Sequence, residues 1–171
     1  MPHKNQPILL QELALKSVGL WVKTVGQDLI HVVCLINQHD HEQGSLVLKN
    51  MIQWINETLY ANVPWYLFDN MAVQVLSSII DLIQETKASY DQFLPMTLFL
   101  SRMKVAVNLT EVVVHSHLKQ IHILNWPKIM RHILNQNLYR LVGLEQLNLG
   151  SGSCGWDTSE VEKYILSGVQ N

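Results

Sequence analysis

The sequence LKQIHI at residues 118–123 recurs as LEQLNL at residues 144–149. Each copy has an aliphatic residue at its first, fourth and sixth positions. The last two alternate with one polar residue, which predicts a short strand whose two apolar side chains share one face. The residues expected to point into the protein are Ile121, Ile123, Leu147 and Leu149.

A strand that recurs in this way needs a helix to return the chain to the start of the next strand. After the first copy, Asn125-Trp126-Pro127 breaks the chain and an apolar stripe over residues 129–138 predicts that helix. After the second copy, a Gly/Ser loop at residues 150–153 and a capping-box pattern at Asp157-Thr158-Ser159-Glu160 precede another stripe at residues 161–169. The offset from Leu118 to Leu144 lies within the period of leucine-rich repeats, which is about 20–29 residues.

Residues 111–171 are therefore predicted to begin a leucine-rich-repeat array. A third strand in step with Leu147 would fall just beyond Asn171, and such arrays normally need three or more repeats to bury a core. We accordingly expect the chain to be part of a longer, truncated repeat protein. The alternative is that the two copies are unrelated β-α units within a small α+β domain.

Residues 1–110 are predicted to form a helical region. Over residues 8–25, Leu10, Ala14, Val18 and Trp21 fall on one helical face at spacings of four, four and three. The apolar stretch at residues 29–36 extends or follows this helix.

Two further helices are expected in the same region. Gly44 and Ser45 would end a polar loop and cap the second helix, whose apolar stripe runs to Leu59. Asn62-Val63-Pro64 would open the third, because a proline in the first turn lacks only an N–H that has no partner there. Its stripe continues to Leu82.

Residues 91–114 permit two predictions. Met96 to Met103 could be helical after Pro95, whereas residues 105–107 and 112–114 could be short strands, because β-branched side chains favour the pleat. The predicted fold class is mainly α, becoming α+β where the β-α units of the repeats begin.

Charged residues make up only 15% of the chain, against about 25% in ordinary soluble domains. This deficit is typical of a protein with apolar surface for a partner, and equally of a merely apolar-rich small domain. The net charge of −2 and the lack of a basic stripe argue against nucleic-acid binding.

The N-terminal residues Met1-Pro2-His3-Lys4 are not followed by the apolar core of a signal peptide, and we expect neither secretion nor a membrane span. Cys34 and Cys154 lie far apart and predict no disulfide framework. Both observations favour a cytoplasmic or nuclear location.

Evidence for catalysis, a metal or a cofactor is lacking in the sequence. Eight histidines include His39, His41, His115, His117 and His122, but no Cys-x-x-Cys pair accompanies them to complete a zinc site. Solvated histidines are the favoured interpretation. Neither a nucleophile elbow nor a phosphate-binding loop is present.

The order of these elements resembles the leucine-rich-repeat substrate receptors of cullin-2 ubiquitin ligases, of the Zyg-eleven and Zer-one type. In that family an N-terminal helix docks on Elongin C through a small residue or proline, then leucine, three residues, cysteine, three residues and an aliphatic residue. Residues 8–24 are similar, with Leu10 and Val18 matching, Ala14 in place of the cysteine, and Leu9 where a small residue is usual.

The family then carries a cullin-binding box, which Val63-Pro64-Trp65-Tyr66-Leu67 resembles at the start of residues 63–82. The resemblance covers these two segments and residues 118–171. It implies a non-catalytic receptor in which Leu10, Ala14 and Val18 enter a pocket of the Elongin B/C adaptor. Val63, Pro64 and Leu67 would touch the cullin, and the repeats would hold a protein substrate.

Two alternatives belong to the same broad class of interaction proteins. The pattern from Val63 to Leu67 also resembles the opening of an F-box, which continues into further short helices and pairs with a different adaptor. The other alternative is a leucine-rich-repeat scaffold without a ligase, in which Leu10 and Ala14 would be buried internally.

Overall fold

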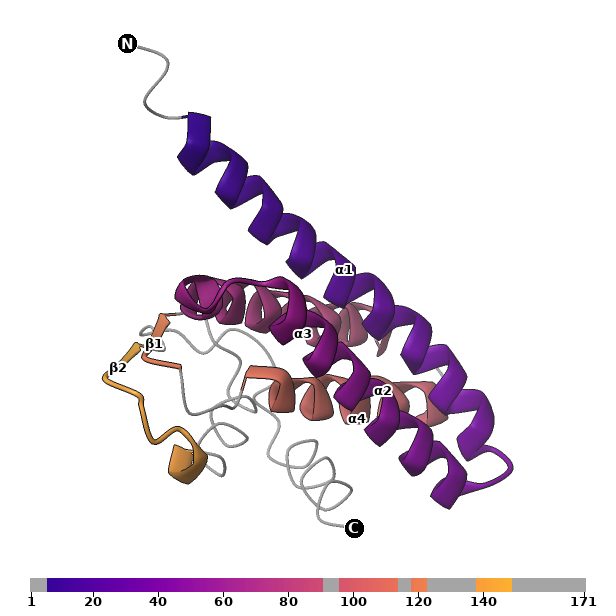
Figure 1. The fold of residues 1–171 in the computed structure, drawn as a ribbon. Coiled ribbons are helices and arrows are strands. Elements are labelled where there is room, and N and C mark those ends of the chain that lie inside the picture. Colours follow the sequence, from indigo (N-terminus) through magenta and orange to yellow (C-terminus); the bar gives the residue numbers. More distant parts are fainter. Residues whose placement is uncertain (1–5, 91–95, 114–117, 123–137, 149–171) are drawn as a thin grey trace.

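Helices account for most of the protein, and a small sheet follows them. The computed structural model describes residues 6–90, 96–113, 118–122 and 138–148. The described elements are α1 (Gln6–Asn37), α2 (His41–Asn62), the 3-10 turn η1 (Trp65–Leu67), α3 (Phe68–Tyr90), α4 (Met96–Leu109), η2 (Thr110–Val113), β1 (Gln120–His122), η3 (Leu138–Arg140) and β2 (Gln146–Asn148) (Figure 1). The predicted mainly helical fold with strands after the helices is confirmed.

Helices α1 and α2 form an antiparallel hairpin around a short turn. The Asp40 side chain accepts hydrogen bonds from the backbone N–H groups of Glu42 (2.9 Å) and Gln43 (3.1 Å), so Asp40 is the N-cap of α2. The predicted loop end and cap at Gly44 and Ser45 are therefore wrong. Gly44 lies inside the first turn of α2, where the Asn37 side chain occupies the space that a Cβ would need.

The first turns of α1 extend beyond the end of α2, because α1 is the longer helix of the hairpin. At 1.5 Å per residue, the 32 residues of α1 span about 48 Å and the 22 residues of α2 about 33 Å. Because the turn joins the end of α1 to the start of α2, the extra length lies at the N-terminal end of α1. Figure 1 shows these turns projecting past the bundle.

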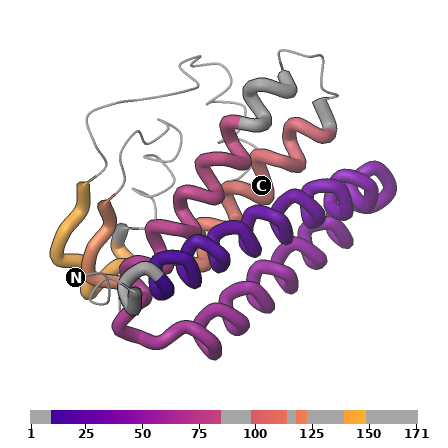
Figure 2. The backbone as a smooth tube through the Cα atoms, turned by 90° about the horizontal axis from the view of Figure 1, so that it is seen from above, coloured from indigo at the N-terminus to yellow at the C-terminus, as the bar shows by residue number. Residues whose placement is uncertain are grey.

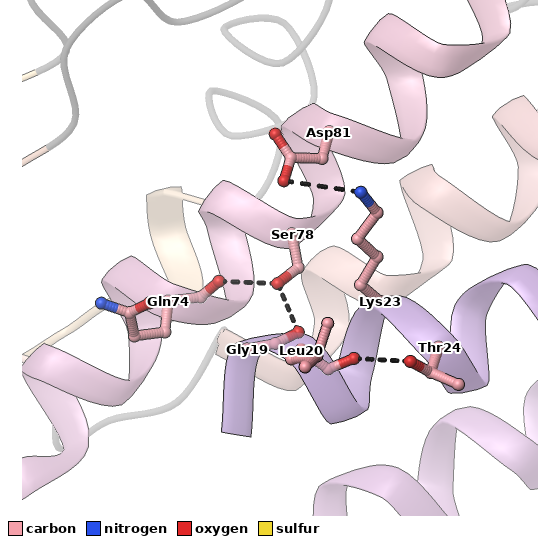
Figure 3. A network of polar contacts seen from close by, with 7 residues as sticks. All are labelled: Gly19, Leu20, Lys23, Thr24, Gln74, Ser78 and Asp81. Atoms are coloured by element: carbon pink, nitrogen blue, oxygen red, sulfur yellow. Dashed lines mark hydrogen bonds and ion pairs between the residues drawn. The ribbon is translucent and has the colours of Figure 1, made fainter. Parts of the chain in front are cut away.

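Helix α3 runs parallel to α1 and crosses it closely at Gly19. An added Cβ at Gly19 would lie 3.3 Å from atoms of Gln74 and Ser78. The buried Ser78 hydroxyl donates to the Gly19 carbonyl (2.6 Å) and to the Gln74 carbonyl (3.0 Å), as Figure 3 shows. The predicted third helix is present, but its α-helical part begins at Phe68, after Pro64 has served as N-cap of η1.

Helix α4 and η2 settle the two predictions for residues 96–113, whereas residues 91–95 and 114 lie outside the described residues. The strand prediction is wrong, because residues 105–107 lie in α4 and Val112 and Val113 lie in η2. Val105, Ala106 and Val107 are all buried. A segment surrounded by apolar neighbours gains more from helical packing than β-branched side chains lose in helix propensity.

Strands β1 and β2 pair in parallel, with Gln120 opposite Gln146 and Ile121 opposite Leu147. The paired residues occupy corresponding positions in the two copies of the repeated sequence. Ile121 is buried and His122 is exposed, as predicted, whereas Leu147 is 41% exposed, and its predicted burial is wrong. Among the described residues β2 pairs only with β1, which leaves its other edge without a covering strand.

The remaining repeat predictions concern segments that the structure does not describe. Ile123 and Leu149 lie outside the described residues, as do the loop at 150–153, the capping box at 157–160 and the helix at 161–169. The predicted helix at 129–138 falls outside them except for its last residue. The leucine-rich-repeat units therefore stay a prediction.

The sheet is attached to the end of the bundle where α3 begins (Figure 2). Asp69, in the first turn of α3, accepts hydrogen bonds from the backbone N–H groups of Lys119 (2.9 Å) and Gln120 (3.3 Å). Leu118 and Ile121 belong to the same apolar core as the helices. The bundle thus continues into β1 without a break in the core.

Replacing Asp69 by alanine is expected to lower the free energy of unfolding by about 1–2 kcal/mol, because two backbone N–H groups of the β1 segment lose their acceptor. Asp69→Asn keeps an acceptor oxygen and should lower the free energy of unfolding less than Asp69→Ala does. Urea denaturation measures the total, and amide hydrogen exchange at Lys119 and Gln120 localises it. Unchanged exchange at both amides in Asp69→Ala would show that this carboxylate does not hold the strand.

Candidate partner-docking site

The residues predicted to bind an adaptor lie on the first turns of α1. Leu10 is 67% exposed and Ala14 is also exposed, while Val18 is half-buried and packs against the core. Spacings of four residues place them on one side of the helix. Their exposure decreases along α1 because only the later turns lie beside α2.

Next to this row, the outer side of α1 carries exposed leucine side chains. Leu13 and Leu20 are 51% and 66% exposed. The Ser17 hydroxyl between them donates to the Leu13 carbonyl (2.9 Å), and the Thr24 hydroxyl donates to the Leu20 carbonyl (2.9 Å; Figure 3). Both hydroxyls are satisfied within the helix, so this side of α1 is apolar in character.

The three residues predicted to bind a cullin differ in exposure. Val63 is half-buried, and its N–H donates to the Leu59 carbonyl (2.8 Å) as the C-cap of α2. Pro64 is exposed, and its carbonyl accepts from the half-buried Leu67 N–H (2.9 Å). Of the predicted residues, Pro64 alone is fully available to a partner.

The sequence interpretation missed the most exposed aromatic residues of this turn. Trp65 and Tyr66 are 77% and 65% exposed, and their rings meet edge to face with centroids 5.9 Å apart. Trp and Tyr dominate the binding energy of many interfaces. Their adjacency after a proline was the available signal.

The two predicted boxes lie at the same end of the bundle. An open cavity of about 400 Å³ lies between the starts of α1 and α3, lined by Gln11 and Lys16 from α1 and by Asn70 and Gln74 from α3. Asn70 is only a few residues beyond η1. One partner assembly could therefore reach both surfaces.

Among the described residues, no group of three or more His, Cys, Asp or Glu side chains is placed to hold a metal ion. Burial raises the pKa of Tyr60, whose hydroxyl donates to the Val112 carbonyl (2.8 Å). Cys34 is buried, and Cys154 lies outside the described residues.

By length and composition alone, two segments could cross a bilayer, Leu10–Asn37 and Trp65–Gln84, each with a mean hydropathy of 1.3. A buried core helix passes the same test, so the expectation of no membrane span stays a prediction. The buried share is 56% for the segment containing α3 and 39% for α1. The core of the bundle accounts for the apolar residues of α3, whereas α1 has an apolar side that the described structure does not cover.

Comparison with known proteins gives no relative. No family model, no curated protein and no solved structure matches this chain. Its function must therefore be inferred from its own residues.

Proposed function

We propose that this chain is the non-catalytic substrate-recognition subunit of a cullin-RING ubiquitin ligase. Leu10, Ala14 and Val18 would dock on Elongin B/C, and the turn from Val63 to Leu67 would contact a cullin. A protein substrate would bind the repeats that begin with β1 and β2. The proposal includes no cofactor, and the complex would act in the cytoplasm or nucleus.

The exposure of Leu10 on a projecting helix is the observation that carries the proposal. A leucine on an uncovered helix exposes apolar area that only a partner can remove from water. Recognition of such a helix by an apolar groove is a common mode of binding, with anchors three and four residues apart. Leu10, Ala14 and Val18 have this spacing, and Leu10 and Ala14 are exposed.

The receptor would work by bringing substrate close to the ligase rather than by chemistry of its own. The parallel pairing of β1 and β2, in the register of the repeated sequence, supports a repeat surface on the same chain. Trp65 and Tyr66, at the same end of the bundle as Leu10, add large rigid side chains to the surface assigned to the cullin.

Two alternatives fit the structure less well. An F-box would continue from the turn into further short helices, whereas α3 is continuous from Phe68 to Tyr90. A scaffold with Leu10 and Ala14 buried internally disagrees with the exposure of both residues.

Binding of the intact chain to purified adaptors tests the proposal. The chain should co-elute with Elongin B/C in gel filtration and should not co-elute with the F-box adaptor. Vesicles of phosphatidylcholine and phosphatidylserine serve as a third arm, because α1 is also apolar enough to meet lipid. Binding to vesicles or to the F-box adaptor, without binding to Elongin B/C, would overturn the proposal.

A further inference from the structure

One aromatic pair connects the face of α1 that carries Leu10, Ala14 and Val18 to helix α2. Trp21 lies three residues after Val18 on that face, and its ring centroid is 5.7 Å from that of Trp54, with the planes inclined by 57°. Trp21 is half-buried and packs against the core, whereas Trp54 is 46% exposed. This face of α1 therefore continues onto Trp54 of α2.

Trp54 has the properties of an interface anchor rather than of a core residue. Aromatic side chains bury about 150–250 Å² each. Trp54 is 46% exposed, so about 100 Å² of its surface remains in contact with water. Neither its indole N–H nor that of Trp21 donates a hydrogen bond within the described part of the chain. The Trp21 ring packs against the Trp54 ring and restricts its motion. A partner could therefore bind the exposed side of Trp54 and its indole N–H at little cost in conformational entropy.

We propose that Trp54 forms the far end of the docking face, so that the partner binds the α1–α2 hairpin and not α1 alone. This inference rests on the proposed function, because the occupant is the same protein that receives Leu10. Continuity decides the occupant: Leu10, Ala14, Val18 and Trp21 follow one side of α1, and the Trp21 ring touches Trp54. The partner's groove would therefore continue past the pocket for Leu10 and end in an apolar wall with a hydrogen-bond acceptor.

Titration of the intact chain with Elongin B/C tests this extension. Trp54→Ala should weaken binding about tenfold, because it removes a large aromatic side chain that the partner would bury. Trp54→Phe keeps a ring against Trp21 but lacks the indole N–H. Its loss of affinity for Elongin B/C should lie between those of the unchanged chain and Trp54→Ala. Tyr139→Ala removes an equally available aromatic, 79% exposed on η3, and should bind as the unchanged chain does.

The fold of each variant is checked by circular dichroism and thermal melting, and affinities are compared at a temperature where all are folded. If Trp54→Ala binds normally while Leu10→Asp does not bind, the extension is overturned and the proposed function stands. If the unchanged chain does not bind Elongin B/C, the proposed function fails and the extension fails with it.

Discussion

Leu10→Asp is expected to weaken binding of the intact chain to Elongin B/C by at least about a hundredfold. An unpaired carboxylate in an apolar groove loses its hydration, which costs several kcal/mol, and a factor of ten in affinity corresponds to about 1.4 kcal/mol. In the free chain Leu10 is 67% exposed, so the substitution should change the free energy of unfolding by less than about 0.5 kcal/mol. The binding defect should thus appear without a folding defect.

Leu35→Asp is the matched control for this substitution. Leu35 is a 63% exposed leucine on the same helix, about 38 Å further along it. Isothermal titration of both variants, with thermal melts alongside, separates a local binding defect from a general effect of an added charge. Full binding by Leu10→Asp would remove the first turns of α1 as the docking site.

Leu82→Ala is expected to have the largest effect on stability, lowering the free energy of unfolding by about 2–5 kcal/mol. The Leu82 side chain is fully buried where α1, α3 and α4 meet, and its Cδ1 would lie 2.9 Å from a Cβ added at Gly26. Loss of its methyl groups therefore leaves a cavity between three helices rather than one that solvent can fill. Urea denaturation followed by circular dichroism measures the change.

The neighbouring Gly26 provides a check on this interpretation. Gly26→Ala alone should lower the free energy of unfolding by no more than about 2 kcal/mol, because its methyl group meets Leu82 and Leu109 while alanine gains about 1 kcal/mol of helix propensity over glycine. In the Leu82→Ala background, the same methyl group enters the space that the leucine side chain has left. The loss of free energy of unfolding in the double variant should therefore be smaller than the sum of the losses in the two single variants. Leu46→Ala, at a 52% exposed leucine of α2, should change stability by less than about 0.5 kcal/mol. Strict additivity would show that Gly26 and Leu82 do not share one packed junction.

The surfaces and core that these variants probe were predictable from sequence to different degrees. The periodicity of Leu10, Ala14 and Val18 predicted a shared helical face, but it could not predict that α2 would leave two of them exposed. Trp54 carries no such signal, because its neighbour Trp21 lies on the other helix of the hairpin and only the folded hairpin brings the rings together. The Trp65–Tyr66 pair is local, but its exposure depends on how the α2–α3 turn sits on the bundle.

The local features of this protein follow from the order of its residues alone. Apolar spacing predicted helices over the first part of the chain, and the recurring LxxLxL pattern predicted two short strands. These features depend on side chains a few residues apart, so they can be predicted without knowing what packs against them.

Other features depend on how segments far apart in the chain pack against one another in the fold. Burial from several sides made residues 105–107 helical despite their β-branched side chains. Asp69, distant in sequence from Lys119 and Gln120, holds β1 against α3. In each case the free energy comes from groups far apart in the chain, which are neighbours only once the bundle has formed.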